Sequence, residues 1–90
     1  MAKIIELKTL PEYFSAVATD LKRFEVRRDD RNYAVGDILI LREFDGLNYT
    51  GRKLSVKITY ILRGGVYGVA EGYVVLSIVK FDEVRKCLKR

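Results

Sequence analysis

Apolar residues alternate with polar ones along much of the chain, which is the period of a half-buried strand. The alternation is cleanest over residues 54–62, where the residues expected to face the core are Leu54, Val56, Ile58, Tyr60 and Leu62. Residues 37–44 are apolar on both faces at their start, so this strand is expected to be central. Three further strands are predicted over residues 4–7, 23–28 and 73–81.

Apolar residues spaced three or four apart predict a helix after the first strand. Leu10, Phe14, Val17 and Leu21 fall on one face of that helix. Thr9 is the expected N-cap, because an acidic residue three positions later would complete a capping box. A second helix is predicted at the C-terminus, where cations late in the helix suit its dipole.

The resulting order is β-α-β-β-β-β-α, in one domain of residues 1–90. The spacing of the strands is too short for repeated βαβ units, which disfavours a parallel layered sheet. A closed or nearly closed antiparallel barrel leaves no exposed strand edge and suits five strands. The sequence therefore predicts a mostly β fold with two helices, arranged as a five-stranded β-barrel.

Charge adds a weak preference for polyanions. The chain has 17 Lys and Arg residues against 12 Asp and Glu residues, for a net charge of +5. The basic excess is most evident over residues 46–70, which hold four basic residues and no acidic one. This distribution is compatible with a nucleic-acid partner but does not establish one.

The residues that the chain lacks narrow its possible chemistry. There is no histidine, so Ser-His and Cys-His catalytic arrangements are excluded. Cys87 is the single cysteine, and alone it makes neither an intramolecular disulfide nor a thiolate zinc site. We therefore expect no metal and no cofactor. No apolar run resembles a signal peptide or a transmembrane helix, so we expect a cytoplasmic protein without membrane contact.

The densest charged segment, residues 22–31, contains the best candidate site. Lys22 lies at the junction of helix and strand, and Glu25 and Arg27 share one face of the strand. Two cations suit a phosphate, and a carboxylate can accept a hydrogen bond from a base amine or a hydroxyl. Arg31, in the following turn, is expected to return to the mouth of the site. The alternative is a solvated face whose ion pairs contribute little.

Aromatic side chains provide candidate faces on which bases could stack. Tyr67, in a glycine-rich loop, and Tyr33, near a turn, are the better candidates, with ordinary surface tyrosines as the alternative. Lys8, at the end of the first strand, is added as a further cation. The predicted ligand-binding residues are then Lys8, Lys22, Glu25, Arg27, Arg31 and Tyr67.

Three segments together resemble a known family. They are the pattern Lys22-x-x-Glu25-x-Arg27 after a short helix, the strand of residues 35–43 and the segment of residues 72–78. In this combination the chain resembles the ASCH family of PUA-like domains, and most closely its small bacterial and phage-associated branch. The resemblance implies a β-barrel with a cleft beside the first helix, lined by Lys22, Glu25 and Arg27, and an RNA-related role.

Two positions depart from the pattern of that family. Asp20 stands where related chains commonly carry glycine, and Ile5 where close relatives often carry histidine. Other ASCH members resemble amidohydrolases that act on an acetylated cytidine and use a lysine followed three positions later by a threonine. Lys22 fits the lysine, but Glu25 stands in the place of the threonine, and a carboxylate is a poor replacement for a hydroxyl nucleophile.

We expect an RNA- or nucleotide-binding module with its cleft around Lys22, Glu25 and Arg27. One alternative is a small enzyme, amidohydrolase-like or a nuclease, that acts on a modified nucleoside or on RNA with Lys22 and Glu25 as an acid–base pair. Another alternative is a protein-interaction or phage accessory module, in which the charged cluster is only a structural network of ion pairs.

Overall fold

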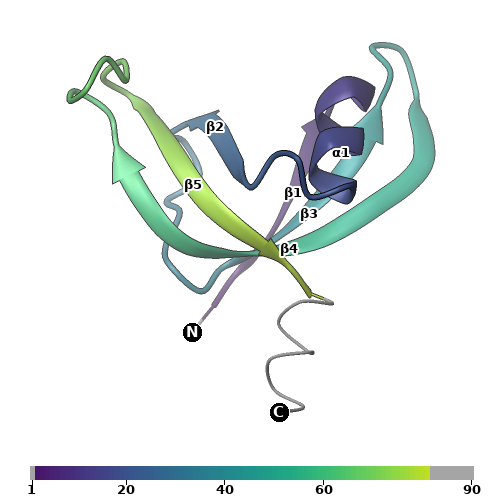
Figure 1. Ribbon diagram of the computed structural model, residues 1–90, viewed down its shortest axis with the longest axis horizontal. Helices are drawn as coiled ribbons and strands as arrows, with labels where there is room; N and C mark the ends of the chain where they lie inside the picture. Colours follow the sequence, from purple (N-terminus) through teal and green to yellow (C-terminus); the bar gives the residue numbers. More distant parts are fainter. Residues whose placement is uncertain (1, 82–90) are drawn as a thin grey trace.

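Five strands form one curled sheet with a helix lying against it in the computed structural model of the protein, which describes residues 2–81 (Figure 1). The elements are β1 (Ile4–Thr9), α1 (Pro11–Ala18), β2 (Phe24–Arg28), β3 (Ile38–Phe44), β4 (Tyr49–Arg63) and β5 (Tyr73–Lys80). The helix expected after Asp82, and Cys87 within it, lie outside the described residues. No helix among residues 2–81 is long and apolar enough to span a membrane.

The sheet is a mixed half-barrel with the strand order β1-β3-β4-β5-β2, so β1 and β2 are its two edges. The mostly β fold with five strands is confirmed, but the closed antiparallel barrel is wrong. β1 pairs with β3 in parallel, and the other three pairings are antiparallel. The parallel pair is possible because α1 and β2 lie between these strands in the chain and supply the long crossover that it requires.

The long strand β4 shapes the half-barrel, because its first part pairs with β3 and its second part with β5. Figure 1 shows β4 bending between these two parts, so that the sheet has two wings that diverge from the bend. α1 packs against β3 in one wing, and β2 lines the edge of the other. The α1–β2 connection crosses from one wing to the other (Figure 1).

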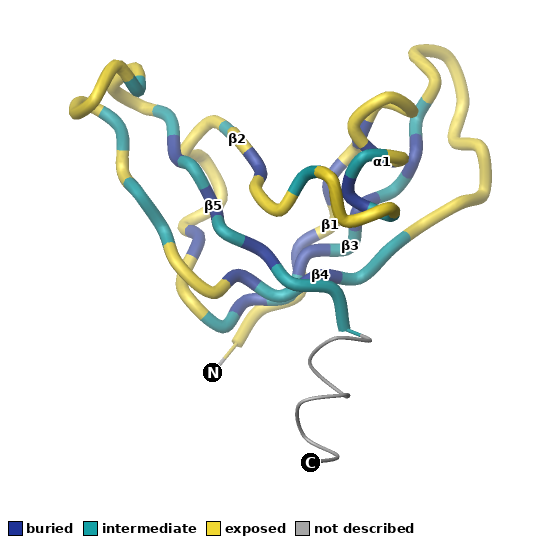
Figure 2. The backbone as a smooth tube through the Cα atoms, viewed as in Figure 1, coloured by how far each residue is buried: buried dark blue, intermediate teal, exposed yellow. Residues whose placement is uncertain are grey.

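One cluster of buried side chains joins the sheet to α1 (Figure 2). Its members are Ile5, Leu7, Phe14, Val17, Tyr33, Leu39, Leu41, Val56, Ile58, Val74, Leu76 and Ile78. The predicted packing of the β4 residues Val56 and Ile58 into one core with the α1 residues Phe14 and Val17 is confirmed. Alternate residues of β3 and β5 supply most of the remainder, as expected for strands with one buried face.

Tyr60 was expected in the core but is 65% exposed. The register between β4 and β5 shifts between Ile58 and Tyr60, so Thr59 is an extra residue with no opposite residue in the register of β5. A bulge of this kind reverses which side chains face the core for the rest of the strand. Ile61 therefore packs against the core, whereas Tyr60 and Leu62, both expected to face it, do not belong to the cluster.

The ends of α1 also differ from the expectation. Thr9 is not an N-cap but a buried residue of β1; the N-cap is Leu10, which has no side-chain capping bond, and Pro11 takes the first helical turn. Leu21 is 85% exposed, because the helix ends at Ala18. Asp20 then takes a left-handed backbone conformation, with φ of 65°, that terminates the helix.

The bulge predicts unequal costs for two substitutions in β4. Ile58→Ala removes a fully buried side chain and should lower the free energy of unfolding by about 2–5 kcal/mol. Tyr60→Ala, two residues along the same strand, removes an exposed side chain and should change it by about 0.5 kcal/mol or less. Urea denaturation of the two variants and the wild type measures both effects. Equal losses would contradict the bulge.

Asp37, just before β3, is a buried carboxylate that ties the start of β1 to the preceding turn. Its Oδ1 accepts a hydrogen bond from the backbone nitrogen of Lys3 at 3.0 Å, and its Oδ2 accepts one from the backbone nitrogen of Ala34 at 2.9 Å. The ammonium of Lys3 lies 2.9 Å from Oδ2. Burial acts to raise the pKa of Asp37, but the hydrogen bonds and the charge of Lys3 outweigh it and hold the pKa below its usual value.

Asp37 should therefore make part of the stability sensitive to acid. Its pKa is lower in the folded chain than in the unfolded one, so its stabilising effect is present above the unfolded pKa and is lost as the pH falls through the folded pKa. We expect Asp37→Asn to be less stable than the wild type at neutral pH and to lose less stability below about pH 4. Urea unfolding of both proteins at a series of pH values tests this; curves that run parallel down to the lowest pH would contradict it.

Candidate functional site

β2 turns its charged face inward and its apolar face toward solvent. Glu25 is 2% exposed, whereas its neighbours Phe24 and Val26 are 45% and 53% exposed. The interpretation of this strand as a solvated face of weak ion pairs is therefore wrong for Glu25. A carboxylate can be buried in this way only when nearby cations and hydrogen-bond donors compensate its charge.

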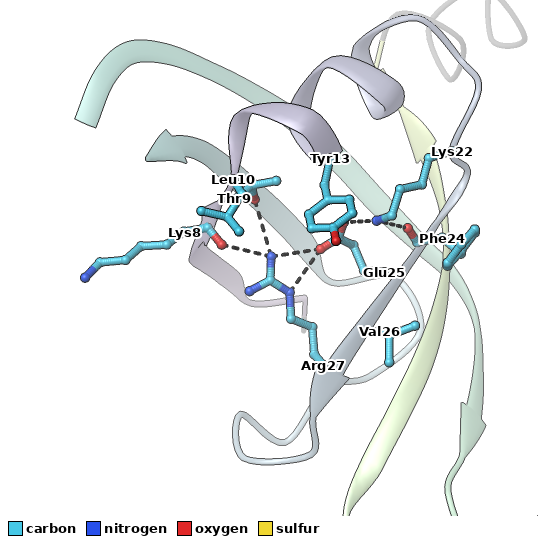
Figure 3. A pocket seen from close by; sticks show the side chains of 9 residues that line it. All are labelled: Lys8, Thr9, Leu10, Tyr13, Lys22, Phe24, Glu25, Val26 and Arg27. Atoms are coloured by element: carbon cyan, nitrogen blue, oxygen red, sulfur yellow. Dashed lines mark hydrogen bonds and ion pairs between the residues drawn. The ribbon is translucent and has the colours of Figure 1, made fainter. Parts of the chain in front are cut away.

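Two cations compensate the Glu25 carboxylate, one at each oxygen (Figure 3). The ammonium of Lys22 donates to Oε1 at 2.7 Å. The guanidinium of Arg27 donates to Oε2 through Nε at 3.0 Å and through Nη2 at 2.8 Å. Lys22 also donates to the backbone oxygen of Phe24 at 2.7 Å, which fixes the lysine over the start of β2.

Arginine side chains bridge the open side of the half-barrel between β2 and β1. Nη2 of Arg27 donates to the backbone oxygen of Lys8 at 3.0 Å and lies 3.3 Å from the hydroxyl oxygen of Thr9. Arg31 reaches the backbone oxygen of Glu6 at 3.5 Å. These two carbonyls lie on the side of β1 away from β3, so the arginines satisfy part of an edge that no strand covers.

A pocket of about 580 Å³ lies over this cluster, between the end of β1, α1 and β2 (Figure 3). Its lining residues are Lys8, Thr9, Leu10, Tyr13, Lys22, Phe24, Glu25, Val26 and Arg27. Two half-exposed aromatic rings belong to its walls, and the ammonium of Lys22 lies 4.9 Å from the ring centre of Phe24 and 5.7 Å from that of Tyr13. The pocket thus combines aromatic surface with two cations held by a buried carboxylate.

The structure brings together three of the predicted site residues, Lys22, Glu25 and Arg27, and places the other cations at the margin. Lys8 lines the same pocket through its backbone, whereas its ammonium points away and lies 4.6 Å from the ring centre of Phe44 (Figure 3). Arg31 lies in an adjoining hollow, which also includes Arg27 and Lys8.

The predicted aromatic residues are elsewhere. Tyr67 is 91% exposed in the β4–β5 loop and does not line the pocket. Tyr33 is neither of the two things considered for it, a stacking face or a surface tyrosine: it is a core residue, and burial raises the pKa of its hydroxyl. Tyr13 and Phe24 line the pocket instead. Phe24 was overlooked as a site residue, and the signal that could have found it is its position between Lys22 and Glu25.

The two departures from the ASCH pattern lie outside the pocket. Asp20 has the left-handed backbone that glycine adopts freely, and one of its carboxylate oxygens lies 3.3 Å from the ammonium of Lys80. Ile5 is buried in the core, with its side chain 7% exposed. Neither residue lines the pocket.

The buried carboxylate predicts a strong effect of its main partner on stability. Arg27→Ala leaves Glu25 with Lys22 alone and removes a bridge to β1. It should lower the free energy of unfolding by about 3 kcal/mol, which is the lower end of the range measured when one partner of a buried ion pair is removed. Arg28→Ala, at the exposed neighbouring position, is the matched control and should have little effect.

A second substitution separates charge from packing in this test. Adding Glu25→Gln to Arg27→Ala should recover part of the lost stability, because an amide needs no cation. Thermal and urea denaturation of the three variants measure these differences. If Arg27→Ala is no more destabilising than Arg28→Ala, the ion pairs do not support the fold.

Known proteins similar to this chain place it in a family, and the matched range includes the residues of the site. A curated relative from Escherichia phage P2, described as "Uncharacterized 12.9 kDa protein in GpA 3'region", is 49% identical over 59 residues, which are 66% of this chain. The aligned part of this chain spans about half the length of that relative, 54%. Residues 4–78 match the family described as "Domain of unknown function (DUF3850)", and this range contains every residue that lines the pocket. The chain belongs to the DUF3850 family.

Proposed function

We propose that the protein is a nucleotide- or RNA-binding module that takes one nucleoside phosphate in the pocket over Glu25. The base would lie against Phe24 and Tyr13, and the phosphate would lie against Lys22 and Arg27. The observation that carries the proposal is the presence, in one pocket, of two half-exposed aromatic rings and two cations anchored on a buried carboxylate.

The electrostatics of the pocket favour an anion. Two cations against one carboxylate leave one net positive charge, and the side chains of Lys22 and Arg27 are still 17% and 23% exposed. Nη1 of Arg27 has no partner within residues 2–81, so it can donate to a ligand without breaking the pair with Glu25. Arginine held in this way is preorganised for a phosphate oxygen.

The shape and walls of the pocket favour a base next to that phosphate. A volume of about 580 Å³ is within the usual range for small-molecule sites. Aromatic rings beside cations are the usual means of holding unpaired bases, because every base has a face that stacks. The resemblance to the ASCH family, with its RNA-related role, points the same way.

Binding fits the hydrogen bonding of the cluster better than catalysis does. A general base needs a carboxylate oxygen that can take a proton from the substrate. Both oxygens of Glu25 already accept hydrogen bonds from Lys22 and Arg27, and the side chain is 3% exposed. We therefore assign Glu25 the role of positioning the two cations.

Phe24→Ala should weaken binding of uridine monophosphate by about 5- to 150-fold, which corresponds to the loss of one stacked base, about 1–3 kcal/mol. Tyr60→Ala removes an exposed aromatic ring outside the pocket and should leave the affinity unchanged. Isothermal titration at low salt measures the affinities, and denaturation curves verify that both variants remain folded.

Three results would decide against this proposal. The first is an unchanged affinity in Phe24→Ala, and the second is that the wild type does not bind the nucleotide at low salt. The third is turnover of RNA or of an acylated nucleoside by the wild type that Glu25→Gln abolishes, which would identify the protein as an enzyme.

A further inference from the structure

A basic groove continues from the pocket along the β1 side of the sheet. A hollow of about 430 Å³ shares Lys8 and Arg27 with the pocket, and a third hollow of about 360 Å³ shares Glu6, Arg42 and Tyr49 with the second. Because neighbouring hollows share lining residues, the three lie next to one another. We call the second and third hollows together the basic groove.

Cations outnumber carboxylates along the basic groove. Its lining cations are Lys8, Arg27, Arg31, Arg42, Arg52 and Lys53, and the lining carboxylate is that of Glu6, 3.5 Å from Arg42. Carboxylates beside the groove pair with three of the other cations: Glu25 with Arg27, Asp30 with Arg31 and Glu43 with Arg52. Arg31, Arg42 and Arg52 keep 49%, 39% and 58% of their side-chain surface exposed, so they can contact a ligand in the groove.

The groove also contains an arginine and an aromatic ring in contact with each other, groups on which a second base can stack. The guanidinium of Arg42 lies 3.9 Å from the ring centre of Tyr49, and that ring packs edge-on against Phe44 at 5.2 Å. Tyr49 is 43% exposed. Bases stack on guanidinium planes as well as on aromatic rings, and both are present here.

From this row of adjoining hollows, with their cations and aromatic rings, we infer that the ligand is a single strand of RNA several nucleotides long, rather than a free nucleotide. This inference rests on the proposed function. One base occupies the pocket, the phosphate beside it contacts Arg27, and the following nucleotides run along the basic groove past Arg31 and Arg42 to Tyr49. Arg27 is the joint between the two parts, because it lines both the pocket and the second hollow.

The test compares uridine monophosphate with oligouridylates of three and six nucleotides, over a series of salt concentrations. We expect the affinity to rise at least about tenfold from the monophosphate to the longest strand. The dependence of log affinity on log salt should steepen by about 0.7 for each additional phosphate contact. Poly-glutamate of matched charge is the control for binding of any polyanion and should bind much more weakly.

Variants separate the groove from the pocket. Arg42→Ala and Tyr49→Ala should each weaken the six-nucleotide strand several-fold and leave the monophosphate unchanged, and Arg42→Ala should reduce the salt slope by about 0.7. Arg28→Ala, an exposed arginine outside the groove, is the matched control. Circular dichroism and thermal melting establish that each variant is folded.

Each result assigns success or failure to one of the two proposals. Equal affinity for the monophosphate and the longer strands, with binding lost in Phe24→Ala, would overturn the strand and leave the nucleotide pocket intact. If binding depends on strand length and is weakened by Arg42→Ala but not by Phe24→Ala, the groove binds the strand and the proposal of a nucleotide-binding pocket is overturned. The inference that the ligand is a strand of RNA would be overturned if poly-glutamate binds as tightly as RNA. It would also be overturned if RNA does not bind at low salt.

Discussion

The arrangement of the two sheet edges depends on a buried negative charge between them, the carboxylate of Glu25. Because it lies at the open side of a half-barrel, the ion pairs that neutralise it also connect parts of the chain that no sheet hydrogen bond joins. Lys22 fixes the α1–β2 junction to β2, and Arg27 connects β2 to the end of β1. A charge that costs free energy to bury thereby specifies how the two edges of the sheet stand relative to each other.

The same contacts explain why the pocket is where it is. The two edge strands are too far apart to pair, and side chains rather than backbone groups fill the space between them. This leaves a hollow whose floor is charged and whose walls are apolar. Charged side chains along β1 and β2 also make these exposed edges poor templates for pairing with another chain. Edge protection and a candidate binding site therefore arise from the same residues.

The sequence predicted the local structure well and the long-range arrangement less well. The alternation in β3 and β5 and around Ile58 located the strands and much of the core, because burial of one face is a local pattern. The charged triad was also predicted to converge. The parallel β1–β3 pairing and the bulge after Ile58 depend on which strands meet, which alternation cannot tell. The interpretation of the charged face of β2 as a solvated surface was wrong. Phe24 is more apolar than Glu25, and only the two cations make it favourable to bury the carboxylate in place of the ring. Tyr33 was misplaced because its turn folds back onto the core.

Arg27 both supports the fold and lines the pocket, and this has a consequence for how members of this family should be compared. A substitution there changes the fold as well as the pocket, so natural selection for stability alone would keep Arg27, Glu25 and Lys22 together. Their retention in a relative is therefore weak evidence that the relative binds the same ligand. Phe24 and Tyr13 are better markers, because both rings are half exposed and lie outside the core cluster. Divergence at these two positions, with the triad kept, would mark a lineage that has retained the architecture and changed what it recognises.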